Sequence, residues 1–458
     1  MNEHTENNVV DQEQIESRTL ASKERYLRPI DTARRLRHLM WCEFELSRAA
    51  FGWLPAVDTY EGKTEIGRYG YVHNQHMGHL YSRLQELPGN LNEKQGTPPL
   101  IREAFERMTT APSLASFYGG YLLVLQNMYA DYDQLKLALD PILDAPTLDK
   151  LKFVEIERHG MIDWARKQAQ FAYTEDGAGC VEMTQWKHYV AAVWVLMQQG
   201  LQQDSAVAEV IWPTHPAGQA AGPVPTHSTL DPRFPVYVPK SSVFQKAYSD
   251  TSMSPLNDSV KQMHYINATE IGAAESLCYF YYGVQRMPLQ FYLDTARHLW
   301  DEIRHSQMGL RRLTQMGYKP EQFFWFKGSS GKAFDELSQE YFPEMYASLT
   351  MVAEPCSFIK KRKSAEKFWE FGDALSAIQC EFDMVDERMH VDFGKKWGPE
   401  LFKQINDPIT AQEMSDRMRT RRVEKLGAAT SPEEINKIIK NFPGFCGLST
   451  IELEYSNF

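Results

Sequence analysis

The chain has 458 residues, enough for two or three domains with a large core. Hydrophobic residues make up 43% and charged residues 24%, which is ordinary for a globular protein, and the net charge of −11 argues against nucleic acid or an anionic membrane as the main partner. The chain begins with a polar, acidic stretch and contains no apolar run of bilayer length, so we expect neither secretion nor membrane insertion, but a cytoplasmic protein with reduced cysteines.

Residues 1–203 show apolar side chains at helical spacing, separated by loops and by the helix breaker Pro88-Gly89-Asn90. This pattern predicts an all-α N-terminal bundle. Its expected helices cover about 26–51, 65–87, 98–110, 114–137, 147–172 and 182–203.

Residues 204–259 differ in composition, because prolines recur between Pro213 and Pro239 and forbid a continuous helix. We expect an extended Pro-rich connection here, with a short strand at 236–238. The following segment, 260–400, again has helical periodicity and predicts a four-helix bundle with helices at about 260–285, 289–316, 344–371 and 373–398. Residues 401–458 are expected to hold short helices and a C-terminal tail.

Two of the four expected helices carry the pattern Asp-Glu-x-x-His, at 301–305 and again at 386–390. Positions three apart share a helix face, so Glu302 and His305 can bind one metal ion, and Glu387 and His390 can do the same. Two such helices, each joined by a single glutamate from another helix, provide the inward-facing ligands of di-iron carboxylate bundles.

Hairpin geometry identifies the two single glutamates. Helices that share a site should turn about midway between their ligands. Glu270 lies 32 residues before Glu302, and Glu354 lies 33 residues before Glu387, with a helix break near each midpoint. Pro355 should kink the third helix directly after Glu354. The predicted metal ligands are Glu270, Glu302, His305, Glu354, Glu387 and His390.

Four further residues near these ligands have expected roles. Asp301 and Asp386 precede the ligating glutamates and are predicted to accept the ring N–H of the histidine on the opposing helix. His298, four residues before Glu302, is either an extra ligand or, as we favour, a buried residue beside the ligands; Asp383 is its equivalent on the fourth helix. Glu275 lies about 140° around the helix from Glu270 and should face away from the metals.

The Asp-Glu-x-Arg-His form of residues 301–305, together with the paired motif, resembles the hydroxylase subunits of bacterial multicomponent monooxygenases. More broadly, it resembles the ribonucleotide reductase small subunit and the acyl-carrier desaturases. The chain is identified as a member of the ferritin-like di-iron carboxylate superfamily on roughly residues 260–400. The resemblance implies two tandem ferritin-like helical bundles, of which the C-terminal one carries the metal site.

Carboxylate-rich sites with some histidine suit iron or manganese better than structural zinc. The expected function is therefore a non-haem di-iron oxidase or oxygenase that uses O₂ on a small organic substrate, with two Fe ions or a Mn/Fe pair. The expected partners are this substrate and a reductase or other electron donor, and a homodimer stays open as an assembly state. The alternative is a ferroxidase or another iron-handling ferritin-like protein.

The N-terminal half looks like a degenerate copy of the C-terminal half. Residues 68–76 align with 297–305 so that His76 matches His305, but His73 stands at the position of Glu302. This half either still holds a metal or, as we favour, has become a packing partner without one, because it offers too few carboxylates at matched positions. Its remaining candidate ligands are Glu43 or Glu45, His73, His76, His79 and Glu155.

Overall fold

The computed structural model describes residues 26–89, 91, 93–173, 177–216, 224, 227–235, 255–323, 325, 341–426, 431 and 433. Regular secondary structure in these ranges is helical, which confirms the all-α class. The expected strand at 236–238, much of the Pro-rich connection and most of the C-terminal tail lie outside the described residues. Among the helices of the described ranges, none is both long and apolar enough to cross a membrane.

The contacts of the chain divide it into two compact units, and the division falls inside two helices. Unit 1 comprises 1–45, 75–92 and 97–219, and unit 2 comprises 46–74, 93–96 and 220–458. The helices α2 (Pro29–Trp53) and α3 (Tyr60–Leu84) therefore contribute residues to both units. The predicted bundles at 1–203 and 260–400 remain predictions.

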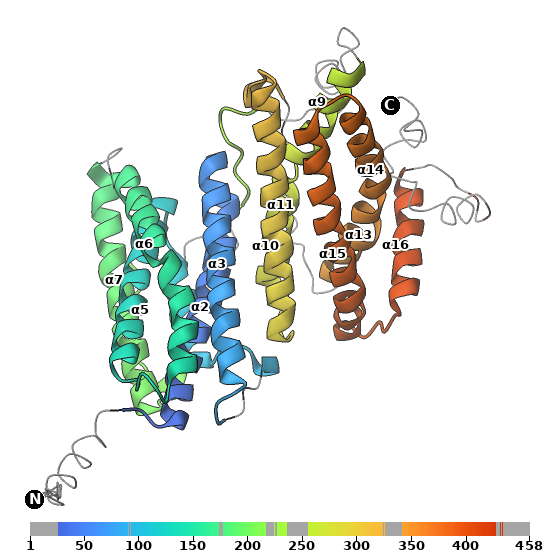
Figure 1. The fold of residues 1–458 in the computed structure, drawn as a ribbon. Coiled ribbons are helices and arrows are strands. Elements are labelled where there is room, and N and C mark those ends of the chain that lie inside the picture. The colour runs from blue at the N-terminus through green and yellow to red at the C-terminus, as the bar shows by residue number, and fades with distance from the viewer. Residues whose placement is uncertain are drawn as a thin grey trace, which may run out of the picture. The chain divides into compact units, whose positions relative to one another are not determined.

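Unit 1 is built around α5 (Leu114–Leu137), whose long apolar face packs against α6 (Ala145–Tyr173) and α7 (Gly177–Gln203) (Figure 1). Ser113 begins this helix by accepting a hydrogen bond from the backbone N of Ser116 at 3.2 Å. Large aromatic side chains such as Phe117, Tyr129 and Trp186 fill the core. The unit also contains α4 (Pro99–Thr109) and a 3₁₀ turn η3 (Val207–Glu209).

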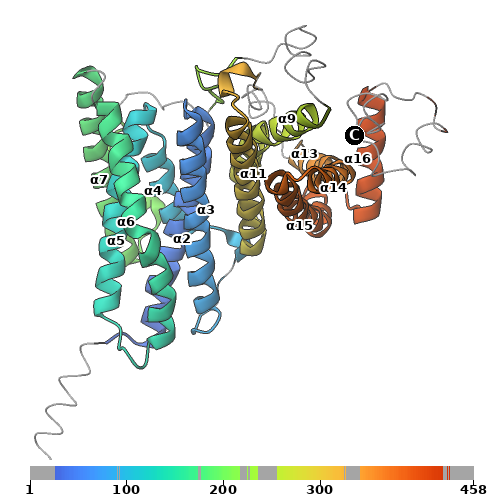
Figure 2. The same cartoon turned by 45° about the horizontal axis from the view of Figure 1, so that its top comes forward.

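Unit 2 holds the helices that carry the predicted ligands. Figures 1 and 2 show α14 beside α15, and α11 packs against α9, α10 and α15. Its longer elements are α9 (Pro255–Ala268), α10 (Ile271–Gly283), α11 (Leu289–Gln315), α13 (Tyr341–Ser348), α14 (Glu354–Glu370), α15 (Ala374–Gln404) and α16 (Ala411–Leu426). The short ones are η1 (Leu54–Ala56), η2 (Glu93–Gln95), η4 (Pro320–Gln322) and the π-helical η5 (Leu349–Ala353).

The expected single helix over 260–285 is wrong, because a turn at Thr269 and Glu270 separates α9 from α10. The end of α9 docks on α11 instead of continuing. Ser306 Oγ donates to the carbonyl of Ala268 at 2.7 Å, and Gly309 leaves room for the backbone of α9, since a Cβ there would collide with Ala268 N. The interruption places Glu270 at the N-cap of α10.

The expected helix over 344–371 is divided into α13, η5 and α14. Pro355 has no backbone N–H, and the regular ladder is interrupted just before it: the amide of Glu354 bonds the carbonyl of Leu349, five residues back. The helix is therefore interrupted by a single π-helical turn beside Pro355, and a kink at this place stays a prediction. The interruption makes Glu354 the first residue of α14.

The turn before the fourth helix is the one that the sequence predicts. Gly372 has a φ of +79°, which favours glycine, and Asp373 accepts from Ser376 N at 3.2 Å as the N-cap of α15. Arg312 on α11 bonds the same aspartate at 2.7 Å and ties the turn to the neighbouring hairpin.

Candidate metal centre

The six predicted ligands come from four places in unit 2 and lie in its interior. Glu270 projects from the turn between α9 and α10, Glu302 and His305 from α11, Glu354 from the start of α14, and Glu387 and His390 from α15. All are buried except the Glu270 side chain, which is 18% exposed.

These side chains form two adjoining groups. In the first, which we call the His390 group, ligand atoms of His298, Glu302, Glu354 and His390 all lie within 4.8 Å of one another. The second, the His305 group, consists of two sets that share His305, and within each set the ligand atoms again lie within 4.8 Å of one another. One set is His305 with Glu270 and Glu302, and the other is His305 with Asp383 and Glu387. Glu302 belongs to both groups.

The two histidines present the same ring atom to the carboxylates. His390 Nδ1 lies 3.7 Å from Glu302 Oε1 and 3.8 Å from both Glu354 Oε1 and Glu387 Oε2. His305 Nδ1 lies 3.3 Å from Glu270 Oε2 and 3.6 Å from Asp383 Oδ1. Both rings therefore aim Nδ1 at the centre.

The opposite ring nitrogens face the two aspartates that precede the ligating glutamates. His390 Nε2 lies 3.4 Å from Asp301 Oδ2, and His305 Nε2 lies 3.3 Å from Asp386 Oδ2. Each histidine thus meets an aspartate from the opposing helix, in the crossed arrangement that the sequence predicts. An acceptor at this position fixes the ring orientation and the tautomer of a metal-bound histidine.

Two arginines of α11 hold both aspartates. Arg297 Nε lies 2.9 and 2.8 Å from the two Asp301 oxygens, and its terminal nitrogen lies 3.3 Å from Asp386. Arg304 pairs with Asp301 and, at 3.1 Å, with Asp386. Burial raises the pKa of Asp301, but hydrogen bonds from His390 and Arg297 outweigh it and lower the value to about 2. Asp301 is therefore a charged acceptor at neutral pH.

Burial lowers the pKa of His305 and His390, but the surrounding carboxylates outweigh this effect. Asp383 acts most strongly on His305, and Asp301 on His390, and both values rise to about 10. A divalent cation that binds Nδ1 must therefore displace a proton from each ring, so metal affinity should increase with pH.

The donor set fits a pair of iron or manganese ions. Among the described residues, three buried atoms that face the centre make no hydrogen bond: Nδ1 of His305, Nδ1 of His390 and Oε2 of Glu387. Buried polar atoms are rarely left without a partner. The centre offers imidazole nitrogens together with a larger number of carboxylate oxygens, and iron and manganese accept both kinds of ligand.

His298, which we expected to be a buried residue beside the ligands, lies close to two of the ligating glutamates. Its Nε2 is 3.1 Å from Glu354 Oε1 and 3.3 Å from Glu302 Oε1, and its ring stacks on His390 with centroids 3.7 Å apart. Its Nδ1 makes no hydrogen bond to the described residues, so it lacks the carboxylate that backs the other two rings. His298 therefore reaches the His390 group but differs from His305 and His390.

Sequence reasoning missed two polar residues of the centre and gave Asp383 no role. Asn267 Nδ2 donates to Asp383 at 2.6 Å and to Glu270 at 3.2 Å. Lys361 Nζ lies 2.5 Å from Asp383 Oδ1 and 2.6 Å from Glu387 Oε1. The available signal was periodicity, since Lys361 stands two helical turns after Glu354, and Asp383 one turn before Glu387.

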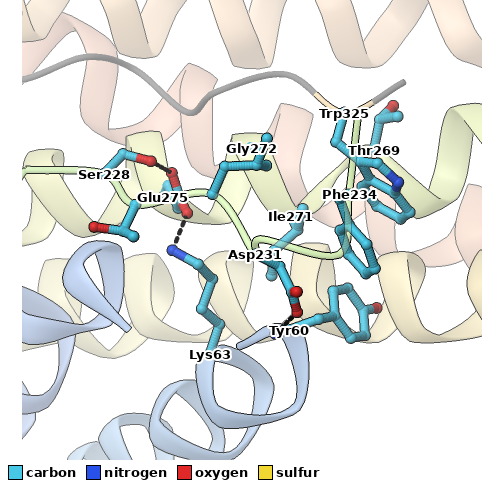
Figure 3. A pocket seen from close by; sticks show the side chains of 12 residues that line it. Tyr60, Lys63, Ser228, Asp231, Phe234, Thr269, Ile271, Gly272, Glu275 and Trp325 are labelled. Carbon is cyan, nitrogen blue, oxygen red and sulfur yellow. Dashed lines mark hydrogen bonds and ion pairs between the residues drawn. The ribbon is translucent and has the colours of Figure 1, made fainter. Parts of the chain in front are cut away.

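Glu275 lies away from the ligands, as expected, but it is buried and not solvent-exposed. Lys63 Nζ and Ser228 Oγ each contact it at 2.6 Å (Figure 3). These residues line a pocket whose other wall is aromatic, where Phe234 and Trp325 stack with centroids 4.4 Å apart. Thr269, Ile271 and Gly272 also line it, so the pocket lies beside the turn that carries Glu270.

The candidate ligands of the N-terminal half mostly have protein partners. In unit 1, His76 Nδ1 lies 3.2 Å from Glu43 Oε1, which also accepts from Tyr132 at 2.9 Å. The His79 ring stacks on Phe153 with centroids 4.4 Å apart. Glu155 forms an exposed ion pair with Lys136, and Glu45 accepts from Thr97 at 2.5 Å. His73 belongs to unit 2 and is buried. That this half is metal-poor stays a prediction.

Residues 202–426 match a protein family described as "Protein of unknown function (DUF455)". All residues of the candidate centre fall inside this range. No curated protein and no solved structure matches the chain.

Proposed function

We propose that unit 2 binds two iron ions, or a manganese and an iron ion, and uses O₂ to oxidise a small organic substrate. One observation carries this proposal: two buried histidines aim Nδ1 at a group of five carboxylates, and each ring is held from behind by an aspartate of the opposing helix. That pattern serves ligand orientation, which a merely structural polar cluster does not need.

The protein residues would bind the ions, orient them and exclude water. Glu302 belongs to both groups, so its carboxylate would help to hold either ion, and Glu387 would hold an ion in the His305 group. Asp301 and Asp386 would keep the Nε2 proton in place, and His298 would hold Glu354 through its Nε2. A bound ferrous pair supplies electrons for the reduction of O₂.

The pocket beside Glu270 supports the choice of a small organic substrate. Its aromatic wall suits an apolar group, while Lys63, Glu275 and Ser228 offer polar contacts on the other side (Figure 3). Gly272 adds free space, since nothing lies within 4 Å of the position that a Cβ would take. A substrate in this pocket would approach the centre through the turn at Glu270.

We also propose that residues 1–203 and 260–400 are tandem ferritin-like bundles, the second of which carries the centre. The match in register between 68–76 and 297–305 supports the repeat. A cytoplasmic location agrees with the buried free thiols of Cys42, Cys278 and Cys380.

The test is metal analysis of full-length protein from iron-supplemented cells, followed by O₂ uptake after anaerobic reduction. We expect about two iron ions per chain, and at most about one in Glu302→Gln. Glu275→Gln is the matched control for iron content alone, because it removes another buried carboxylate of the same unit outside the centre. Iron-free wild-type protein, or equal iron content in the wild type and the Glu302 variant, would exclude the proposal.

A ferroxidase gives a different result in the same assay. With excess Fe²⁺ and no organic substrate, a ferroxidase oxidises many ions per chain, whereas the proposed oxygenase should stop after its own ions are oxidised. Sustained Fe²⁺ oxidation would therefore replace the oxygenase proposal by the iron-handling one.

A further inference from the structure

Lys361 brings a positive charge into the His305 group. It stands seven residues after Glu354 on α14, about two turns along the same face, and it is 1% exposed. Its Nζ lies 2.5 Å from Asp383 Oδ1, 2.6 Å from Glu387 Oε1 and 3.7 Å from Glu270 Oε1. Three carboxylates of one group thus share a single ammonium.

The His390 group is organised differently. Its carboxylates, Glu302 and Glu354, pair with the rings of His298 and His390 at 3.1 to 3.8 Å. An imidazole ring can itself bind a metal ion, whereas the ammonium of Lys361 has no lone pair to offer. The His305 group therefore contains a side chain that can only compete with a metal ion, while the rings of the His390 group can serve as ligands.

A metal ion in the His305 group would share the carboxylates of Asp383 and Glu387 with Lys361. Metal–oxygen bonds are about 2.0–2.2 Å long, so an ion bound to Asp383 Oδ1 would lie within about 4.7 Å of Nζ, given the 2.5 Å contact. Two cations at that separation in a buried site repel strongly, because little water is present to screen them. The ammonium must move away before the ion can bind.

We propose that Lys361 is an internal cation that competes with the second metal ion, so that the two groups fill in sequence. The His390 group fills first. The His305 group fills only when the Lys361 ammonium leaves Asp383 and Glu387, and until then the lysine stabilises these carboxylates. This inference rests on the metal centre of the proposed function.

The test is a Mn²⁺ titration of the metal-free full-length protein, with free Mn²⁺ measured by EPR. We expect two classes of site in the wild type, separated by roughly 100-fold or more in affinity. Lys361→Met should tighten the weaker site by roughly 10-fold or more, while Lys361→Arg, which keeps a cation, should leave the gap in place. Thermal unfolding adds a second readout: Lys361→Met should melt earlier than wild type without Mn²⁺ and recover when Mn²⁺ is added.

Lys63→Met is the matched control, because Lys63 is also buried in unit 2 but pairs with Glu275 outside the centre. It should leave both Mn²⁺ affinities unchanged. Two equal sites in the wild type, or an unaltered weaker site in Lys361→Met, would overturn the inference while leaving the metal centre intact. Absence of Mn²⁺ and iron binding in every protein would instead overturn the proposed function. If Lys361→Met does not fold, the wild-type isotherm and Lys361→Gln still decide the question.

Discussion

Asp301 is held on several sides, since it contacts one histidine ring and two arginines. Its low pKa shows that the charged form is the one that these partners select. Such an acceptor acts on the histidine that it contacts, because a charged acceptor orients the ring of a metal-bound histidine and makes it more basic.

Replacing Asp301 by Asn keeps the shape but removes the charge that faces His390 Nε2. We expect the fold to survive and iron affinity or O₂-dependent turnover to fall by roughly 10–100-fold. Iron titration and O₂ uptake measure this. Asp392→Asn is the control, since Asp392 is an exposed residue of the same helix as His390 and pairs only with Lys395 among the described residues. Unaltered iron affinity and O₂ uptake in Asp301→Asn would contradict the orienting role.

His264 is buried outside the centre and is neutral in the folded protein. Burial, followed by the charge of Arg312, lowers its pKa from 6.5 to about 3. A folded pKa below the unfolded one means that the stabilisation is present above pH 6.5 and is lost as the pH falls towards 3.

We therefore expect wild-type protein to lose its stability advantage over His264→Gln as the pH falls below 6.5, by roughly 1.4 kcal/mol per pH unit. Urea unfolding followed by tryptophan fluorescence at several pH values between 7 and 4.5 measures both free energies of unfolding. If the free energies of unfolding of the two proteins changed in parallel with pH, protonation of His264 would not destabilise the folded protein.

At the level of elements, the docking of α9 on α11 determines where Glu270 stands. Gly309→Ala should force the two backbones apart and cost about 1–3 kcal/mol in the free energy of unfolding, with weaker metal binding because Glu270 moves. Gly272→Ala is the matched control in α10: open space surrounds it, so it should be neutral or stabilise by up to about 1 kcal/mol. Urea unfolding and iron titration check both, and equal stability of the two variants would contradict the close-approach argument.

Periodicity predicted much of the centre, because Glu-x-x-His on a helix places both side chains on one face whatever surrounds it. The same rule placed Asp301 and Asp386 one residue away, where they meet the opposing helix. The break before Glu270 could not be predicted in this way, since it depends on Ser306 and Gly309, which reach it only after α11 has docked.

The role of Lys361 was missed for another reason. Lysine is not a usual metal ligand, so a search for ligand patterns passes over it, although its heptad spacing from Glu354 was visible. The π-helical turn before Glu354 was predicted only as a kink, because Pro355 removes a hydrogen-bond donor but does not specify how the helix accommodates the loss.

For the molecule as a whole, the N-terminal half should support stability and not metal binding. The double variant His73→Ala/His76→Ala is expected to keep nearly all bound iron, because residues 1–203 offer too few carboxylates at the positions that match the predicted ligands of residues 260–400. It should unfold at lower temperature, since both histidines are buried. Metal analysis and thermal unfolding measure these outcomes. A loss of half the iron would mean that this half binds metal.

The crossed contacts between α11 and α15 also have a consequence for biosynthesis. Each helix carries ligands together with the aspartate that orients the other helix's histidine, so neither provides a finished half-site. A ribosome-bound chain that ends before Ala374 presents His305 without Asp386, and it lacks Glu387 and His390 altogether. Iron capture by the proposed centre would therefore wait until α15 has emerged and docked, so unfinished chains would not hold the ions.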